Sequence, residues 1–125
     1  MRSIFVSFFV VPFLLGCNSD DGPLDGVNLR IKNSSNRIFD EIYVDSGTES
    51  HTFGPLVPRM SSPYEEFDQL YRYAYVRIIS GDSEYIFQPI DYVGETPLSP
   101  GRYTYKLEID DPDFIYGVSL ELLKD

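Results

Sequence analysis

The sequence predicts an all-β fold, a single small antiparallel β-sandwich of seven or eight strands. Apolar and polar residues alternate with a period of two in several windows, most clearly at 27–32 and 103–110. This period is typical of strands that have one buried face. Groups of Gly, Pro, Asn, Asp and Ser separate the windows, and no window combines helical spacing with caps at both ends. Short strands between regular turns indicate a β-sandwich.

The strands are expected to follow one another from Val27 onward. They are predicted at 27–32, 37–45, near 50–56, near 62–67, at 72–80, 84–90, 103–110 and from about 115 to 123. The third and fourth are expected to be short or at a sheet edge, because Pro55, Pro58 and Pro63 each remove a ladder donor. In the second strand, Asp40 interrupts a row of apolar residues at alternate positions. Val76 and Ile78, with Ala74 on the same face, are assigned inward, as are Tyr105 and Leu107, and Ile38, Ile42 and Val44 of the second strand share one parity.

The six residues Leu98-Ser99-Pro100-Gly101-Arg102-Tyr103 resemble the Leu-x-Pro-Gly-x-Tyr approach to a late strand in known sandwiches. The resemblance is to immunoglobulin-like, fibronectin-like and transthyretin-like domains. In those families a tyrosine near the corner often fastens the loop by a hydrogen bond to backbone, which implies this role for Tyr103. The resemblance favours an immunoglobulin-like or transthyretin-like sandwich and carries no function, because this architecture hosts many functions.

The first residues have the layout of a secretory signal. Arg2 precedes an apolar run from Ile4 to Leu15, which is too short for a membrane-spanning helix of about 20 residues. The run closes with Leu14-Leu15-Gly16-Cys17, which contains the sole cysteine and resembles the lipobox of bacterial lipoproteins. The resemblance implies cleavage before Cys17 and attachment of diacylglycerol and a further acyl chain, such as palmitate, to that residue. The alternatives are an ordinary signal peptide or a buried strand.

These features divide the chain into a lipoprotein signal peptide (1–16), a lipidated tether (17–26) and a β-sandwich domain (27–125). Directly behind the cysteine lies the acidic segment Asn18-Ser19-Asp20-Asp21-Gly22. It resembles the export tag of some Gram-negative bacteria, which display lipoproteins on the outer face of the outer membrane. We therefore expect a lipid anchor in the cell outer membrane with the domain facing outward. A tether that only stays unfolded, with the domain facing the periplasm, is the alternative.

The charge balance limits the partners. Removal of residues 1–16 leaves 109 residues with 9 basic and 20 acidic side chains. Such a chain lacks the basic surface that nucleic acid or anionic headgroups require, and it favours cationic partners. With its only cysteine used for lipid, the domain has no intrachain disulfide, so its core alone must stabilise the fold.

Catalytic groups are sparse, and we expect no catalytic residue, no cofactor and no metal. His51 is the only histidine, lies in a polar stretch without a nucleophile motif, and is expected to be solvated. Paired carboxylates can hydrolyse glycosides. Adjacent Glu65 and Glu66 do not suit this role, because on a strand they would point to opposite faces. The run from Asp110 to Asp113 lacks the ligand spacing and glycine of an EF-hand, which favours a solvated turn over a calcium site.

The tyrosine row is the most suggestive feature of the domain. Tyr71, Tyr73 and Tyr75 share one parity, and Tyr85 and Phe87 are available on the next strand for an aromatic ladder. Tyr71 and Tyr73 are the candidate ligand contacts. The alternative is that the rings pack inward while the hydroxyls reach the sheet edge.

The predicted function is a non-catalytic binding, accessory or scaffold module that takes a protein or glycan partner. Two alternatives stay open. One is a periplasm-facing lipoprotein that supports envelope assembly, and the other is a small carboxylate-dependent hydrolase.

Overall fold

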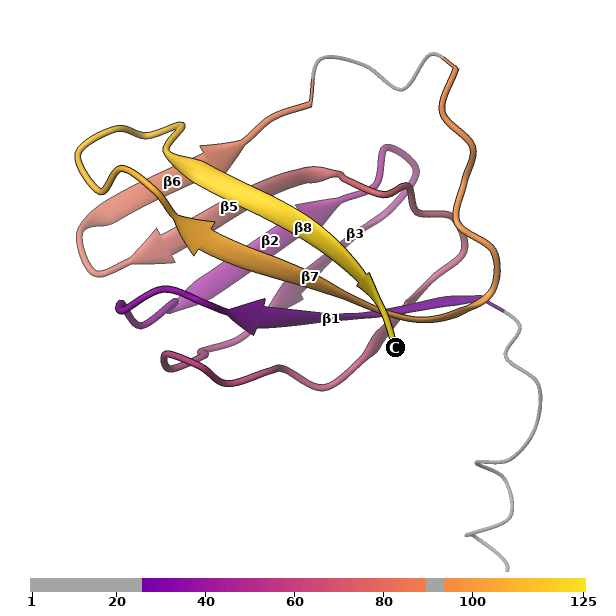
Figure 1. Cartoon of the computed structure of the whole chain (residues 1–125), viewed down its shortest axis with the longest axis horizontal. Helices are drawn as coiled ribbons and strands as arrows, with labels where there is room; N and C mark the ends of the chain where they lie inside the picture. The colour runs from indigo at the N-terminus through magenta and orange to yellow at the C-terminus, as the bar shows by residue number, and fades with distance from the viewer. Residues whose placement is uncertain (1–25, 90–93) are drawn as a thin grey trace, which may run out of the picture.

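The structure is a computed structural model that describes residues 26–89 and 94–125 and forms eight strands there (Figure 1). The predictions for the signal peptide, for Cys17 and for residues 17–25 lie outside the described residues. The strands are β1 Val27–Asn33, β2 Glu41–Asp45, β3 Ser50–Phe53, β4 Glu65–Phe67, β5 Tyr75–Ser80, β6 Ser83–Phe87, β7 Gly101–Ile109 and β8 Val118–Lys124.

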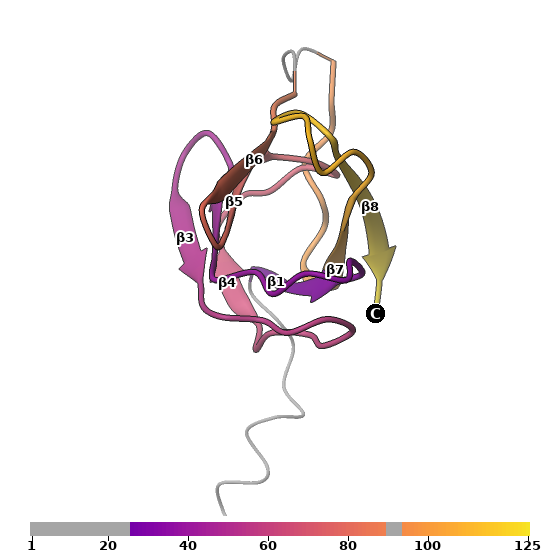
Figure 2. The ribbon, with the colours of Figure 1, turned by 90° about the vertical axis from the view of Figure 1, so that its left-hand side faces the viewer.

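The strands form two four-stranded sheets that pack face to face, which confirms the predicted β-sandwich. One sheet has the order β4-β1-β7-β8 and the other β3-β2-β5-β6. Figure 2 views the sandwich end-on, with the two sheets enclosing the core. The shared interior is made of alternate residues from both sheets, including Leu29, Ile78 and Leu107, each with no exposed surface.

One strand pair departs from the antiparallel prediction. β1 and β7 run parallel, in register from Val27 opposite Gly101 to Asn33 opposite Leu107. The reason is the route of the chain: β6 belongs to the other sheet, and the following segment returns to the end at which β1 begins. Leu98 N donates to Leu70 O at 2.8 Å, and Gly101 N donates to Gly26 O at 3.2 Å. β7 therefore starts beside the start of β1, and the first sheet is mixed.

The alternation of apolar and polar residues correctly predicted the buried faces of β1, β5 and β7. Val76 and Ile78 are fully buried, as are Tyr105 and Leu107, whereas Lys106 between them is half-buried on the outer face. The predicted fastening role of Tyr103 is also confirmed. Its hydroxyl donates to Ser99 O at 2.8 Å, which closes the corner before β7.

The second strand is shorter than predicted, and the prediction for Ile38 is wrong. β2 begins only at Glu41, Ile38 is 51% exposed, and Phe39 is buried in its place. Asp40 causes the shift in parity: its N–H donates to Ile79 O at 2.7 Å, and its carboxylate accepts the Gly81 N–H at 2.7 Å. These two bonds divert the chain before β2.

Two other strands also start later than predicted. β5 begins at Tyr75, not at residue 72, and β8 begins at Val118, not near 115. Residues 110–117 form a tight turn that Asp110 N closes by donating to Gly117 O at 2.7 Å. A Cβ at Gly117 would collide with the backbone of Asp111, so this turn needs glycine. Tyr116, next to Gly117 at the end of this turn, is exposed.

Asn33, at the end of β1, is a buried polar residue that fastens the following turn. Its amide Nδ2 donates to Arg37 O at 2.7 Å and to Leu56 O at 2.9 Å. Its Oδ1 accepts the Ser35 N–H at 2.9 Å and the Ser35 hydroxyl at 2.7 Å. This side chain therefore ties the β1–β2 turn to the segment that follows β3.

Three turns gather at the end of the sandwich opposite Gly26 (Figure 1). They are the turns at 33–36, 81–82 and 110–113. Ser34 N donates to Leu107 O at 2.9 Å, which joins the first to the end of β7. The Tyr85 hydroxyl on β6 donates to Pro112 O at 3.0 Å and joins the last to the other sheet. The sequence left the relative placement of these turns open. Within residues 26–89 and 94–125, no helix has the length and apolar character needed to span a membrane.

Candidate functional site

The two open edges of the sandwich are built differently. At one edge, β3 of one sheet faces β4 of the other, and a polar network joins them. At the other edge, β6 faces β8, and a groove runs between them. The groove is the better candidate site, because the polar side chains of the network already bond to other groups of the network.

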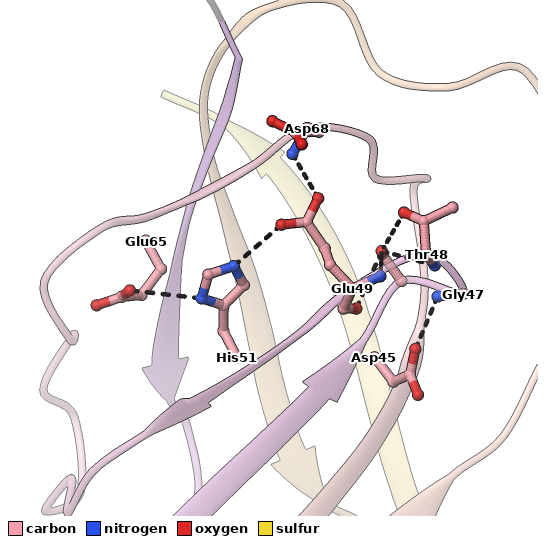
Figure 3. A network of polar contacts seen from close by, with 8 residues as sticks. Asp45, Gly47, Thr48, Glu49, His51, Glu65 and Asp68 are labelled. Atoms are coloured by element: carbon pink, nitrogen blue, oxygen red, sulfur yellow. Dashed lines mark hydrogen bonds and ion pairs between the residues drawn. The ribbon is translucent and has the colours of Figure 1, made fainter.

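The network at the β3–β4 edge is centred on His51 (Figure 3). Its Nε2 lies 3.2 Å from Glu49 Oε1, and its Nδ1 lies 3.6 Å from Glu65 Oε1. The imidazole stands edge-on to Phe67, with the ring centroids 4.4 Å apart. Glu49 Oε2 also accepts the Asp68 N–H at 2.6 Å. The prediction of a solvated histidine is wrong, because the ring is half-buried against Phe67 and held between two carboxylates.

This arrangement fastens one sheet to the other and does not resemble a catalytic dyad. Both ring nitrogens face carboxylates, so neither is oriented to activate a hydroxyl nucleophile. Glu65 turns toward His51, while Glu66, opposite Asn28 in the register, lies exposed on the outer face. The two adjacent carboxylates thus point to opposite sides, as predicted. Among the residues that the structure describes, no group of three His, Cys, Asp or Glu is placed to hold a metal ion.

The groove at the other edge consists of two hollows of about 570 and 580 Å³ that share Phe87. The first is lined by Arg72, Tyr73, Phe87, Thr96, Leu98, Leu120, Glu121 and Leu122. The second is lined by Ile86, Phe87, Gln88, Pro89, Tyr116 and Val118. Together they follow β8 over its length, from Tyr116 at the end with the three turns to Leu122 at the end near Gly26. We call this pair of hollows the β8 groove.

The strand alternation of β8 builds one wall of the groove. Val118, Leu120 and Leu122 share the inward parity and pack against the core. The facing wall comes from Phe87, which ends β6 opposite Val76, and from Leu98 of the segment that crosses between the sheets. The register with β7 fixes the wall, since Tyr105 lies opposite Leu122 and Leu107 opposite Leu120. Apolar side chains of β6 and β8 therefore form much of the lining, together with the polar residues Arg72, Thr96, Gln88 and Glu121.

The structure places one of the two predicted contact residues in this wall. Tyr73 lines the groove and is half-buried. Tyr71 is also half-buried but lies outside the lining, and its carbonyl accepts the Tyr105 hydroxyl at 2.7 Å. This bond fixes the segment before β5 against β7, and so positions Tyr73.

The predicted aromatic ladder is wrong. In the register of β5 with β6, Tyr85 lies opposite Ile78 and Phe87 opposite Val76, so both belong to the inner face. Tyr75 lies on the outer face and packs edge-on against Tyr43, with ring centroids 6.1 Å apart. Because β5 begins only at Tyr75, Tyr73 lies before the strand and need not follow its alternation of faces. Tyr73 lines the groove.

Charges differ between the two ends of the groove. At the end near Gly26, Arg72 lines the groove, and on β8 Glu121 lies 3.7 Å from Lys106 Nζ. At the other end lies the acidic turn that contains Asp111 and Asp113, both exposed. The sequence showed this acidic turn but did not show that the turn adjoins the groove, where Tyr116 of the same turn lines the second hollow.

A second polar cluster joins the end of the described chain to the outer face of the mixed sheet. Asp125 Oδ2 accepts the hydroxyls of Tyr64 and Thr104, each at 2.7 Å, and lies 3.4 Å from Arg30 Nε. Partial burial raises the pKa of the Asp125 carboxyl, but these two hydrogen bonds and the Arg30 charge outweigh it and lower the pKa. Partial burial and the bond to Asp125 raise the pKa of Tyr64. The cluster holds the end of β8 against β7 and the approach to β4.

The backbone of β8 is a further feature that sequence reasoning missed. Asp125 N donates to Arg102 O at 2.9 Å, and Gly117 O accepts the Asp110 N–H at 2.7 Å. Residues 117 and 125 therefore direct their backbone toward β7. In an antiparallel pair this direction alternates along the strand. The N–H and C=O groups of Val118, Leu120 and Leu122 consequently point away from β7, toward the open edge.

Comparisons with protein-family models, with curated proteins and with solved structures find no match to this chain.

Proposed function

We propose that this protein is an outer-membrane lipoprotein, anchored through Cys17 and facing outward, whose β-sandwich binds a partner without catalysis. The observation that carries the binding role is the β8 groove with Tyr73 in its wall. Each hollow falls within the range of about 300–1,000 Å³ that is typical of ligand sites. Most of its lining residues are aromatic or aliphatic, and β6 and β8 hold several of them in place, which favours a preorganised site.

The placement of the groove suits a tethered module. The chain enters the domain at Gly26, beside the first residue of β1, and β1 carries it toward the opposite end. At about 3.3 Å per residue, seven residues of strand separate the two ends by about 20 Å. An anchor at Cys17 would leave the distal half of the groove and the three turns directed away from the membrane. Such a position favours an accessory or scaffold role over a role at the lipid surface.

Binding is tested on the full-length protein purified in detergent, with a glycan array and candidate envelope proteins as probes. Tyr73→Ala should weaken binding by more than about 1 kcal/mol, which is more than about fivefold in Kd, without unfolding the domain. Tyr43→Ala is the matched control, because Tyr43 lies on the outer face of β2, outside the groove lining. Equal binding by the two variants would contradict the assignment of the groove.

Orientation is tested separately by protease treatment of intact cells. An outward-facing domain is degraded while a periplasmic marker survives. Protection of the domain until the outer membrane is opened would contradict outward display and indicate a periplasm-facing lipoprotein.

A further inference from the structure

We propose that β8 accepts an extended, cationic segment of a partner protein as an added strand, with alternate apolar side chains of that segment in the β8 groove. The inference rests on the proposed binding function and specifies its partner. Strand addition combines backbone hydrogen bonds, which give affinity, with pockets for alternate side chains, which give specificity.

The backbone of β8 is ready for such pairing. Within residues 26–89 and 94–125, β8 is the last strand of its sheet and pairs with β7 alone. As derived above from the bonds of Gly117 and Asp125, the backbone groups of Val118, Leu120 and Leu122 point toward the open side. An antiparallel segment would exchange N–H···O=C pairs with these three residues.

In the part of the chain that the structure describes, the other three edges of the sandwich are short or blocked, whereas β8 is long and pairs on one side only. β4 has three residues, of which two are glutamates, and β3 has four and is followed by Gly-Pro. β6 has five, is followed by Gln88-Pro89, and its Ile86 N–H already donates to Ile115 O at 2.7 Å. β8 has seven residues, of which Val118 and three leucines are apolar and Glu121 and Lys124 are charged, and it contains no proline. Native edges are usually short, charged or blocked by proline, so a long apolar edge indicates a pairing site.

The groove beside β8 matches the side-chain period of an added strand. Residues opposite Val118, Leu120 and Leu122 would share their inward parity and point into the groove. Neighbouring inward positions on a strand are about 6.8 Å apart, and an added strand lies about 4.8 Å from β8. Phe87 stands between the two hollows, so one inward side chain fits on each side of it. The segment therefore carries apolar residues at alternate positions.

The acidic groups near β8 favour basic residues at the other positions of the segment. The net charge of the chain disfavours a second copy as the partner. The formal net charge of the chain is −10, so two copies repel each other. Glu121 lies on the outward parity of β8 with a 63% exposed side chain, and an opposite charge directly across from it is favourable. Arg72 at the end near Gly26 places the other cations of the segment toward Asp111 and Asp113. The partner is thus a strand that alternates apolar with basic residues.

The test uses blocked nine-residue peptides that alternate valine with lysine and threonine, titrated into the full-length protein in detergent. The lysine peptide should bind at least tenfold more tightly than the same peptide with glutamate. Two further peptides are N-methylated, one at the odd positions and one at the even positions. Strand addition uses only one edge of the peptide, so one of these should lose at least tenfold in affinity and the other should bind as before.

Hydrogen exchange locates the contact. Bound peptide should protect the amides of Val118, Leu120 and Leu122, whereas those of Ser119 and Glu121, already bonded to β7, should change little. Glu121→Lys should weaken binding of the lysine peptide at least fivefold. Asp68→Lys makes the same change in charge at the opposite edge and should leave binding unchanged.

Three outcomes would overturn the inference. Equal binding by both N-methylated peptides would exclude a backbone ladder, and dimerisation through β8 would make a second copy the occupant. Peptides that fail to bind, while Tyr73→Ala still weakens binding of a glycan or a folded protein, would remove strand addition and leave the proposed function standing. If Tyr73→Ala weakened the binding of no glycan, protein or peptide, the proposed function itself would be removed.

Discussion

Asn33→Ala, at the end of β1, is expected to destabilise the domain by about 2–4 kcal/mol. The amide of Asn33 is fully buried and makes four hydrogen bonds. At about 0.5–1.5 kcal/mol each, their loss costs about 2–6 kcal/mol. Leu56 O would keep the Phe39 N–H, and Arg37 O would keep the Ser35 hydroxyl, so the loss falls in the lower part of this range. The Ser35 N–H has no such replacement.

The assay is urea unfolding of the full-length protein, followed by circular dichroism. A domain of this size has a total stability of about 5–15 kcal/mol, so the unfolding midpoint should fall clearly at an unchanged slope. The melting temperature should fall by at least about 8 °C, since 1 kcal/mol corresponds to about 4–8 °C in a domain of 60–100 residues.

Asn36→Ala is the matched control in the same turn. Asn36 is exposed and accepts one bond, from Arg59 Nη2 at 3.3 Å, so its loss should stay within about 0.5 kcal/mol. Equal midpoints for Asn33→Ala and Asn36→Ala would refute the view that the Asn33 amide holds the β1–β2 turn to the segment after β3.

Three other changes have defined outcomes. Cys17→Ser should abolish labelling by a palmitate analogue and release the protein from the membrane, whereas retained label would contradict the lipobox assignment. Leu107→Ala should cost about 2–5 kcal/mol of unfolding free energy and Lys106→Ala less than about 1, with equal costs arguing against the assigned faces of β7. Asp125→Asn should destabilise the protein at neutral pH. Because the folded-state pKa of Asp125 is lowered, the contribution of its carboxylate is present above the ordinary aspartate value of 3.8 and disappears as the pH falls through the folded pKa. The difference between wild type and variant in urea midpoint should therefore narrow in acid, and a difference that widens there would contradict the assigned hydrogen bonds.

The parts of the fold that follow from local pattern were predictable. A period of two assigns a face to each residue of a strand without knowledge of its neighbours, which is why Val76 and Leu107 were placed correctly. The corner bond of Tyr103 spans only four residues and was also predictable. Ile38 was misplaced because Asp40 bonds to Ile79 of β5 and to Gly81 of the following turn, and local parity carries no information about such contacts.

The candidate site was predictable only in part. Tyr73 was found because it belongs to an aromatic row, but its neighbours in the groove come from β6, β8 and the crossing segment. Leu120 and Leu122 looked like ordinary core residues of a final strand. Their exposed backbone edge follows from strand order, and that order depends on the parallel pairing of β1 with β7, which no local pattern predicts. His51 was judged by the polarity of its own segment, while its surroundings are set by Phe67 and Glu65 of β4.

The parallel pairing of β1 has a mechanical consequence. β1 receives the chain at Gly26 and is paired on both sides, over seven positions with β7 and three with β4. The bonds of both ladders lie across the strand direction. A pull on the N-terminal segment, while the end with the three turns is held, runs along β1 and loads these bonds together in shear. Peeling the strand sideways would break them one after another at lower force. The sandwich therefore resists a pull along β1, from its point of attachment to its far end, better than a sideways pull on that strand.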